Sequence, residues 1–556
     1  MVMKKMWKLG GRRKPQRTDS RRALMEDNKE VQDGCGHAGK GQDGPSAQDT
    51  FNTNEQQLFQ ISEEVTLQKL AELLGVACPD ITFEDGSCIS IRPETISGQQ
   101  DVKQSVVRII QRSVSQRFPK QPADLDQNLQ RHLLNVQETV RDELVKLAPL
   151  LDSMGLMGCL IDCYHRQTID HLSDLLQNTR SSRNSLVLMK WVLHTYLSQE
   201  LLDHPDLREM DPIKKVDFLL FTEWVAKAND KLLENVQEEV SGFLEKILQL
   251  ERRQEGDCDE AYVGLYVDTI QCIDAMPKEA QRISSELSDH VRAVCFQELL
   301  TFVRRYTAEQ TEILEKEAKL DKPETTHFFK TLNSCEKLKQ HVQTSGEGVR
   351  RSLLQETVDT LEHMEAFTLK LVLEMVADLA ESHLKNYFKM ENKQFLSLIV
   401  AVQACFPKLS WCQDIQKRVM DKAYKRIAHI YLKHLVRSSQ KRLAKCWSPD
   451  VGRAVAADAA VLHNTISDLA PGVQQWNLLL LRISELLECK GIDVVKLTVA
   501  SMQKDCPTWS EDQDLLPALL RWKGLSRCQV REVLDALPGQ EPKPRSTAWF
   551  SCFGCC

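Results

Sequence analysis

The 556-residue sequence lacks long apolar runs. Its best candidate, residues 395–406, is interrupted by Ser397 and Gln403 and falls short of the roughly 18 to 20 apolar residues that cross a bilayer. The first residues are charged and lack the apolar core of roughly 7 to 15 residues that marks a secretory signal. We therefore expect a cytoplasmic chain, in which most of the 18 cysteines are reduced and buried thiols.

Motifs for catalysis and cofactor binding are also missing. There is no GxxxxGK(S/T) phosphate loop, no GxGxxG between a strand and a helix, no HExxH and no pair of CxxC motifs. The nearest approach to a metal site is Cys159, Cys163, His165 and His171, but zinc sites usually combine closer pairs with a second half-site. We interpret these residues as structural, and we expect no active site, no metal and no cofactor in a protein that is not an enzyme.

The sequence has no period-2 strand pattern, no sustained heptad and no fixed-length repeat, which argues against an α/β enzyme, a single coiled coil and a solenoid. Instead, residues 278–322 and 349–406 contain neither glycine nor proline. In the second stretch one helical face is apolar: Leu354, Val358, Leu361, Val372, Val376 and Leu379. Helix ends are expected at Pro205, Pro212, Pro277, Pro323, Gly346, Gly348, Pro407, Pro449, Pro471, Gly472 and Pro507. The predicted fold is all-α, an elongated rod of consecutive helical bundles.

Composition shifts divide the chain into five predicted segments. Residues 1–50 are Gly-rich and polar, without apolar periodicity, and are expected to be disordered. Residues 51–98 carry one helix and a linker. Residues 99–345 and 346–537 are expected to form helical bundles, and residues 538–556 a flexible Cys-rich tail.

The formal net charge of −7 conceals two basic islands on an acidic body. Residues 1–22 carry a net +8 and residues 417–445 a net +9, which leaves −24 for the remainder. Such an asymmetry usually indicates an anionic partner.

The N-terminal island interleaves Trp7 and methionines with basic side chains. A disordered basic segment with an interfacial tryptophan is suited to an anionic membrane leaflet. The alternatives are a solvated tail and a nuclear-import-like patch. The predicted lipid-binding residues are Lys4, Lys5, Trp7, Lys8, Arg12, Arg13 and Lys14.

The second island is predicted to be a helix that is positive on one face and buried on the other. Its basic face would comprise Arg418, Lys422, Arg426, Lys433, Arg437 and Lys441. This face could meet lipid headgroups, an acidic protein or nucleic acid, or it could neutralise the protein's own acidic body. RNA binding favours aromatic side chains exposed among the basic ones. Since Tyr424 and Tyr431 fit the buried side better, we expect no nucleic acid partner.

The C-terminal tail ends in Trp549-Phe-Ser-Cys-Phe-Gly-Cys-Cys556. A CaaX box is excluded because Phe553 occupies the fourth position from the end. A terminal Cys-Cys resembles doubly prenylated Rab GTPases, but that reaction needs a GTPase domain. We therefore favour S-acylation of Cys552, Cys555 or Cys556 over an unmodified apolar tail. Two acyl chains, or one chain with a polybasic segment, anchor stably to a membrane.

Two segments carry distinctive motifs. The first is Trp191–Tyr196 followed by His204-Pro205-Asp206-Leu207, in which a Trp and an aromatic precede His-Pro-x-Leu. The second is the closing stretch from Cys506 to Arg527, where a Leu-rich helix precedes Leu-Ser. In their order and spacing the two segments resemble the exocyst complex component 3 family, and the resemblance covers roughly residues 55–537. Independently, Ser526 and Gln529 predict a capping box for the last helix.

Some positions depart from the family pattern: Thr508 stands where Asp is common and Lys523 where Arg is common. The departures favour a paralogue, of the exocyst complex component 3-like or tumour necrosis factor alpha-induced protein 2 kind, over the core subunit. The resemblance implies a vesicle-tethering scaffold for exocytosis, peripheral at the plasma membrane or vesicles, that binds exocyst subunits, SNARE proteins or a small GTPase. The alternative that it implies is a phosphoinositide-binding membrane-protrusion adaptor acting with a Ral-type GTPase and actin.

Overall fold

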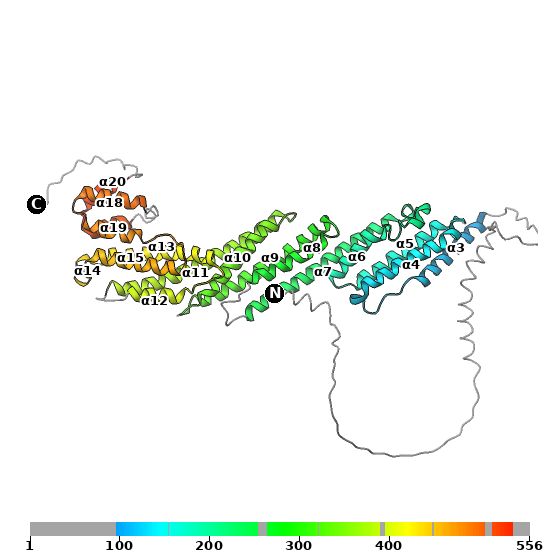
Figure 1. Cartoon of the computed structure of the whole chain (residues 1–556), viewed down its shortest axis with the longest axis horizontal. Helices are drawn as coiled ribbons and strands as arrows, with labels where there is room; N and C mark the ends of the chain where they lie inside the picture. Colours follow the sequence, from blue (N-terminus) through cyan, green and yellow to red (C-terminus); the bar gives the residue numbers. More distant parts are fainter. Residues whose placement is uncertain are drawn as a thin grey trace, which may run out of the picture. The chain divides into compact units, whose positions relative to one another are not determined.

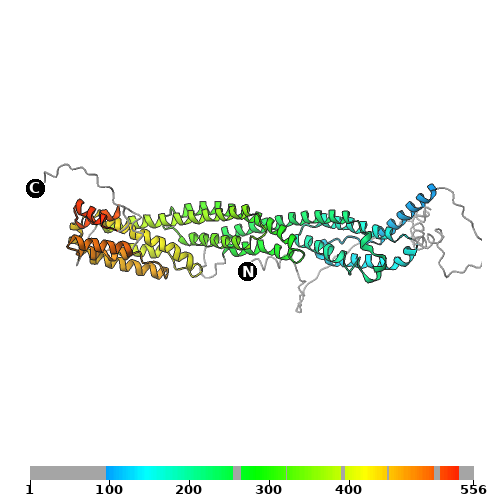
Figure 2. The same cartoon turned by 90° about the horizontal axis from the view of Figure 1, so that it is seen from above.

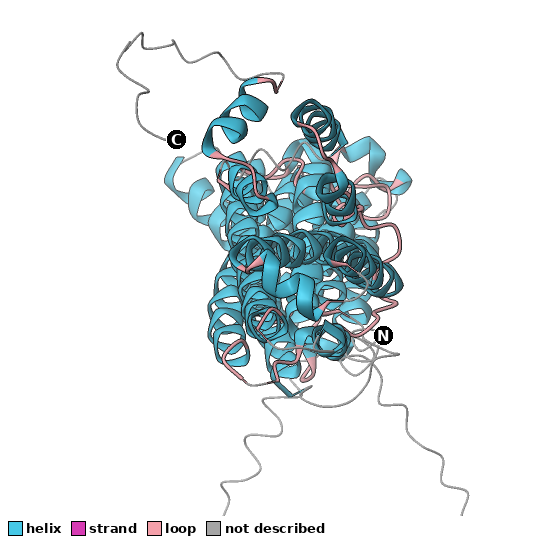
Figure 3. Ribbon diagram, turned by 90° about the vertical axis from the view of Figure 1, so that its left-hand side faces the viewer, coloured by secondary structure: helices cyan, strands magenta, loops and turns pink. Residues whose placement is uncertain are grey.

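The computed structural model describes residues 96–153, 155–253, 264–320, 322–389, 395–447, 450–505 and 514–537. Every regular element within these ranges is a helix, and none of them contains a strand (Figure 3). The all-α fold class predicted from the sequence is therefore confirmed.

The chain folds into two compact units. The first contains the described residues up to 239 together with 276–291, and the second contains 240–275 and the described residues from 292 onward. The helices from the first unit to the middle of the chain are α3 (Ile96–Arg117), α4 (Leu125–Ser153), α5 (Met157–Asn178), α6 (Ser182–Lys190), η1 (Trp191–Tyr196), η2 (Pro205–Met210), η3 (Pro212–Lys215), α7 (Phe218–Arg253), α8 (Leu265–Ala280) and α9 (Ser285–Glu317).

The remaining helices belong to the second unit. They are α10 (Thr325–Ser345), α11 (Arg351–Tyr387), α12 (Phe395–Cys405), α13 (Gln413–Arg437), α14 (Gln440–Cys446), α15 (Val451–Leu469), α16 (Leu478–Leu481), α17 (Ile483–Glu488), α18 (Ile492–Asp505), α19 (Leu515–Lys523) and α20 (Arg527–Asp535).

The first unit forms because its helices carry apolar residues three or four positions apart. In α4 this stripe is buried: Leu129, Leu133, Val136, Val140 and Leu144. Helix α5 packs against both α3 and α4. After α6 the backbone widens into the π-helix η1, in which Trp191 and Tyr196 are buried with ring centroids 5.7 Å apart.

Helix α11 is central to the second unit, where it packs against α10, α12 and α13 (Figures 1 and 2). Its predicted apolar face is confirmed, with Val358, Leu361, Val372 and Val376 buried and Leu354 and Leu379 half-buried. The helix ends at Tyr387 although neither glycine nor proline follows before α12.

One predicted helix end is wrong. Pro277 lies inside α8 rather than at its end. An interior proline removes one backbone hydrogen bond and its ring crowds the carbonyl of residue i−4, but its own carbonyl can still accept, so a helix can continue for about one turn beyond it. The carbonyl of Pro277 accepts hydrogen bonds from Gln281 N at 2.9 Å and from Ser288 Oγ at 2.9 Å, which close this turn onto α9.

The predicted capping box of the last helix is confirmed. Gln529 N donates to Ser526 Oγ at 3.3 Å, and Ser526 N donates to Gln529 Oε1 at 2.9 Å. Two otherwise unsatisfied backbone donors at the start of α20 are thereby paired.

Candidate functional site

The candidate site is the outer face of α13 and the adjoining α14. Helix α13 is fixed by its apolar side, in which Tyr424, Tyr431 and Leu435 are fully buried. Lys422, Arg426 and Arg437 project from the opposite side and are exposed. The prediction that the two tyrosines belong to the buried side is confirmed.

Two of the six predicted basic residues are paired within the protein. The Arg418 guanidinium lies 2.8 Å from Glu336 on α10. Lys433 Nζ lies 3.6 Å from Glu381 on α11, whose carboxylate also accepts a 2.6 Å hydrogen bond from His434. These two cations therefore neutralise part of the protein's own acidic surface, one of the roles considered for this face.

The other four predicted residues are exposed and form no ion pair or hydrogen bond within the described part of the chain. They are Lys422, Arg426, Arg437 and Lys441. At 3.6 residues per turn, the three on α13 fall within about 60° of one another around the helix. We call these four residues the basic face. No carboxylate among the described residues pairs with any of these four charges.

Neighbouring cations have structural roles instead. Lys425 Nζ lies 5.1 Å from the centroid of the Trp476 ring. Arg442 donates to the Phe388 carbonyl at 2.9 Å. Spacing alone gave no means of separating these cations from the free ones, because their partners lie far along the chain.

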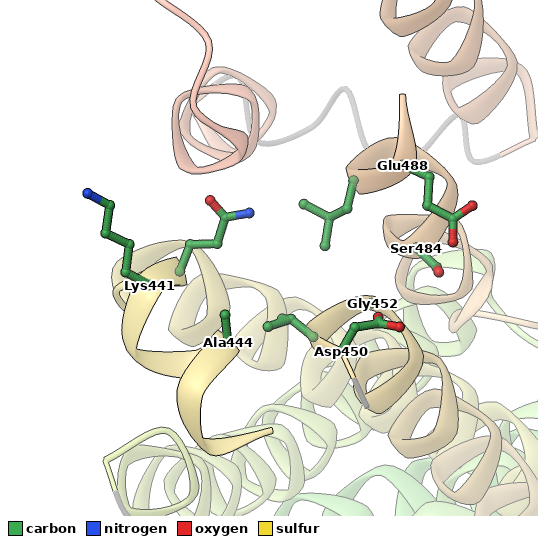
Figure 4. A pocket seen from close by; sticks show the side chains of 9 residues that line it. Lys441, Ala444, Asp450, Gly452, Ser484 and Glu488 are labelled. Carbon is green, nitrogen blue, oxygen red and sulfur yellow. The ribbon is translucent and has the colours of Figure 1, made fainter. Parts of the chain in front are cut away.

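A pocket of about 400 Å³ adjoins the basic face, between α14, the start of α15 and α17. Figure 4 shows Lys441 on one side and Glu488 on the opposite side. The other lining residues are Gln440, Ala444, Asp450, Val451, Gly452, Ser484 and Leu487. The lining mixes charged and apolar groups, and no motif in the sequence predicts this pocket.

A buried acid–tyrosine junction lies behind the basic face, where α11, α13 and α15 meet. The hydroxyls of Tyr387 and Tyr431 both donate to Asp458 Oδ2, at 2.5 Å and 2.7 Å. Withdrawal from water raises the pKa of Asp458 to about 6, against the opposing effect of the two hydroxyls. Rings of Phe388, Phe395 and Trp447 surround Tyr387, with centroids 5.1 to 5.6 Å away. This junction holds the helix that bears the basic face.

The two histidines considered for metal binding face different partners. His165 Nδ1 lies 2.8 Å from the Tyr196 hydroxyl, and its Nε2 lies 3.1 Å from the Asp217 carbonyl oxygen. His171 Nε2 lies 2.7 Å from His132 Nε2. Across the residues with described positions, no three potential metal ligands gather.

The remaining predicted sites lie outside the described residues. These are the N-terminal lipid-binding residues, from Lys4 to Lys14, and the lipidation candidates Cys552, Cys555 and Cys556. Both stay predictions, as does the five-segment division of the chain.

A family model for "Exocyst complex component Sec6" matches residues 53–524. The chain belongs to the Sec6 family of exocyst components. The match includes the segment Trp191–Tyr196 and most of the closing stretch on which the resemblance rested, so that prediction is confirmed. Among solved structures, this Sec6-family chain resembles the "Crystal structure of M-Sec", with a TM-score of 0.58 at 16% identity over 89% of this chain and 86% of the other. That likeness concerns the fold.

Curated relatives of the Sec6-family chain are distant. Tumor necrosis factor alpha-induced protein 2 of Mus musculus is 21% identical over 467 residues, 79% of this chain and 66% of the relative. Exocyst complex component 3-like protein of Homo sapiens is 24% identical over 395 residues, 66% of this chain and 51% of the relative. The chain thus spans between about half and two thirds of these relatives. No helix among the described residues combines the length and apolarity needed to traverse a membrane.

Proposed function

We propose that this chain is a non-enzymatic scaffold of the exocyst type, which tethers vesicles at the plasma membrane during exocytosis. It would act from the cytoplasm as a peripheral membrane protein. Membership of the Sec6 family supports exocyst subunits as partners. SNARE proteins and a small GTPase are further partner classes that the family resemblance implies.

The basic face is the observation that carries this proposal. Three of its cations project from α13, whose other side is packed, and Lys441 projects from α14. None of the four forms an ion pair with another described residue. The face needs no rearrangement before it meets a negatively charged surface. Prepositioned charge of this kind raises association rates and fixes the orientation of a partner.

The contribution of the basic face to membrane affinity depends on how close its cations lie to the anionic lipid. A lysine or arginine close to an anionic membrane contributes about 1 kcal/mol. Four such residues contribute about 4 kcal/mol at most, or roughly a thousandfold in affinity. Salt weakens this attraction because exposed charges are screened beyond about 8 Å at physiological ionic strength.

The test replaces Lys422, Arg426, Arg437 and Lys441 together by glutamine in the full chain. A matched control replaces four exposed cations that are already ion-paired, and it removes the same total charge: Lys227, Arg282, Lys370 and Arg453. Both variants and the parent are titrated with vesicles containing phosphatidylserine and a phosphoinositide. We expect the first variant to lose affinity by about 10² to 10³ and the control to lose much less. Equal losses would refute a specific role for the basic face.

A protein partner would give a different pattern in the same experiment. If vesicle binding is unchanged but copurification of exocyst subunits or a small GTPase falls only in the first variant, the face recognises an acidic protein. Either result supports a scaffold that uses this face, whereas no loss in both assays refutes it.

A second candidate function is favoured by the likeness to M-Sec and to tumor necrosis factor alpha-induced protein 2. In that case the chain is a phosphoinositide-binding adaptor that promotes membrane protrusions with a Ral-type GTPase and actin. Immunoprecipitation from cells separates the two functions. Copurified exocyst subunits or SNARE proteins support tethering, and their absence together with protrusion growth supports the adaptor.

A further inference from the structure

Helix α18 presents an apolar face to solvent. Its inner side is packed through Val495, Val499 and Met502. On its outer side Val494 is 51% exposed and Leu497 is 73% exposed. The two lie about one helical turn apart, so they form one patch. We call Val494 and Leu497 the α18 face.

The C-terminal tail starts beside this helix. Helix α20 packs against α18, and Lys496 Nζ lies 2.6 Å from Glu532 across their contact. The described chain ends at Leu537, two residues beyond α20. The tail therefore leaves from an element that already touches α18.

The tail is long enough to return to the α18 face. Eleven residues, 538–548, separate Leu537 from Trp549. They include Pro538, Pro542 and Pro544, and Pro-rich chains extend by about 3.1 Å per residue, which gives a reach of roughly 34 Å. Helix α18 has 14 residues and a length of roughly 21 Å. The aromatic residues of the tail can thus reach any part of it.

Charge also favours this return. The connecting stretch carries Lys543, Arg545 and Glu541, a net charge of +1. Near α18 the exposed carboxylates of Glu488, at the end of α17, and of Asp535, at the end of α20, form no ion pair within the described residues. A basic connector that passes these acids is attracted rather than repelled.

We propose that the C-terminal tail docks Trp549 and Phe550 on the α18 face of its own chain, and that this withholds Cys552, Cys555 and Cys556 from solvent and membrane. Tethering is what makes such a small contact effective, because a short flexible connection gives a local concentration in the millimolar range. A membrane competes for the same aromatic side chains. The tail therefore exchanges between the helix and the bilayer. This exchange regulates membrane attachment, and it deepens the proposed membrane role of the protein.

The test measures cysteine reactivity in the full-length, lipid-free chain. A maleimide is added under reducing conditions, and the labelling rate of each cysteine is followed by mass spectrometry. Cys528 serves as an internal reference because it is exposed on α20. The parent is compared with Leu497→Glu and with the control Leu396→Glu, since Leu396 on α12 is similarly exposed at 60%.

We expect labelling of Cys552, Cys555 and Cys556 to be about two- to tenfold faster in Leu497→Glu, with Cys528 and the control unchanged. Trp549→Ser with Phe550→Ser must give the same acceleration, and this variant leaves the helix sequence intact. Equal tail rates in all variants would overturn the proposal. Protection that disappears on dilution would overturn it too, because the tail would then dock on a second copy.

This readout is independent of the scaffold function. Thiol reactivity is measured without vesicles or partners, so loss of tail protection says nothing about the basic face. Conversely, a failure of vesicle binding leaves the docking result intact. The two proposals can therefore fail separately.

Discussion

Replacing Asp458 by asparagine should stabilise the protein at neutral and alkaline pH. The folded chain raises the pKa of Asp458 from 3.8 to about 6, chiefly because burial disfavours its charged form. One pKa unit corresponds to about 1.4 kcal/mol, so ionisation of the folded state costs at most about 3 kcal/mol. Asparagine keeps an oxygen that can accept from Tyr387 and Tyr431 and removes the buried charge.

The sign of the pH dependence follows from proton linkage. Between pH 3.8 and about 6 the folded state holds the Asp458 proton more often than the unfolded chain does. Through this group, the free energy of unfolding therefore falls as pH rises across that window and stays lowered above it. We expect Asp458→Asn to gain about 1 to 3 kcal/mol at pH 8 and almost nothing at pH 4.

Hydrogen exchange of α15 peptides, measured by mass spectrometry from pH 4 to pH 8, reports this local stability. Exchange rates are first corrected for their intrinsic pH dependence. Asp468→Asn, an exposed position on the same helix, is the matched control. If Asp458→Asn instead destabilises α15 at pH 8 as much as Asp458→Ala does, the ionised carboxylate is a net stabiliser and the reasoning is wrong.

Two further predictions concern packing and acid sensitivity. Gly452→Ala should lower the free energy of unfolding by about 1 to 3 kcal/mol in chemical denaturation, because the added Cβ would lie 2.9 Å from Ser484 Cα. Gly242→Ala, inside α7, should raise the free energy of unfolding by about 0.5 to 1 kcal/mol, because the added Cβ has no neighbouring atom within 4 Å. Burial first, and then the facing His132, lower the pKa of His171 to about 4, so the folded state binds fewer protons than the unfolded chain below pH 6.5 and loses stability as pH falls. His171→Phe should make hydrogen exchange in α4 and α5 less sensitive to acid between pH 7 and pH 5, and an unchanged acid response would count against this assignment.

The local sequence pattern was sufficient to predict the fold class and to predict which side of a helix is buried. The apolar spacing on α13 placed Tyr424 and Tyr431 inside and the cations outside, because a helix with one apolar stripe has one way to bury it. The end of α11 at Tyr387 had no such signal. No residue in that stretch interrupts a helix by itself, so the end depends on tertiary contacts.

The candidate site was only partly predictable for a related reason. Arg418 and Lys433 were grouped with the other cations by spacing, yet Glu336 and Glu381 lie 82 and 52 residues before them. Pairing over such separations is decided by how helices pack. The same holds for Asp458, which sits in an alanine-rich stretch and acquires its raised pKa from burial between α11, α13 and α15, while the tyrosines of the first two helices donate hydrogen bonds to it.

The π-helix Trp191–Tyr196 bears on which insertions and deletions the chain tolerates. Residues five apart share a side in a π-helix, whereas residues four apart do so in an α-helix. Loss of the exposed residue Leu193 would therefore return the segment to α-helical winding with Trp191 and Tyr196 still on one side. A substitution of either aromatic residue would remove buried contacts, including the Tyr196–His165 hydrogen bond. This segment should accept a one-residue change of length more readily than a change of its buried side chains.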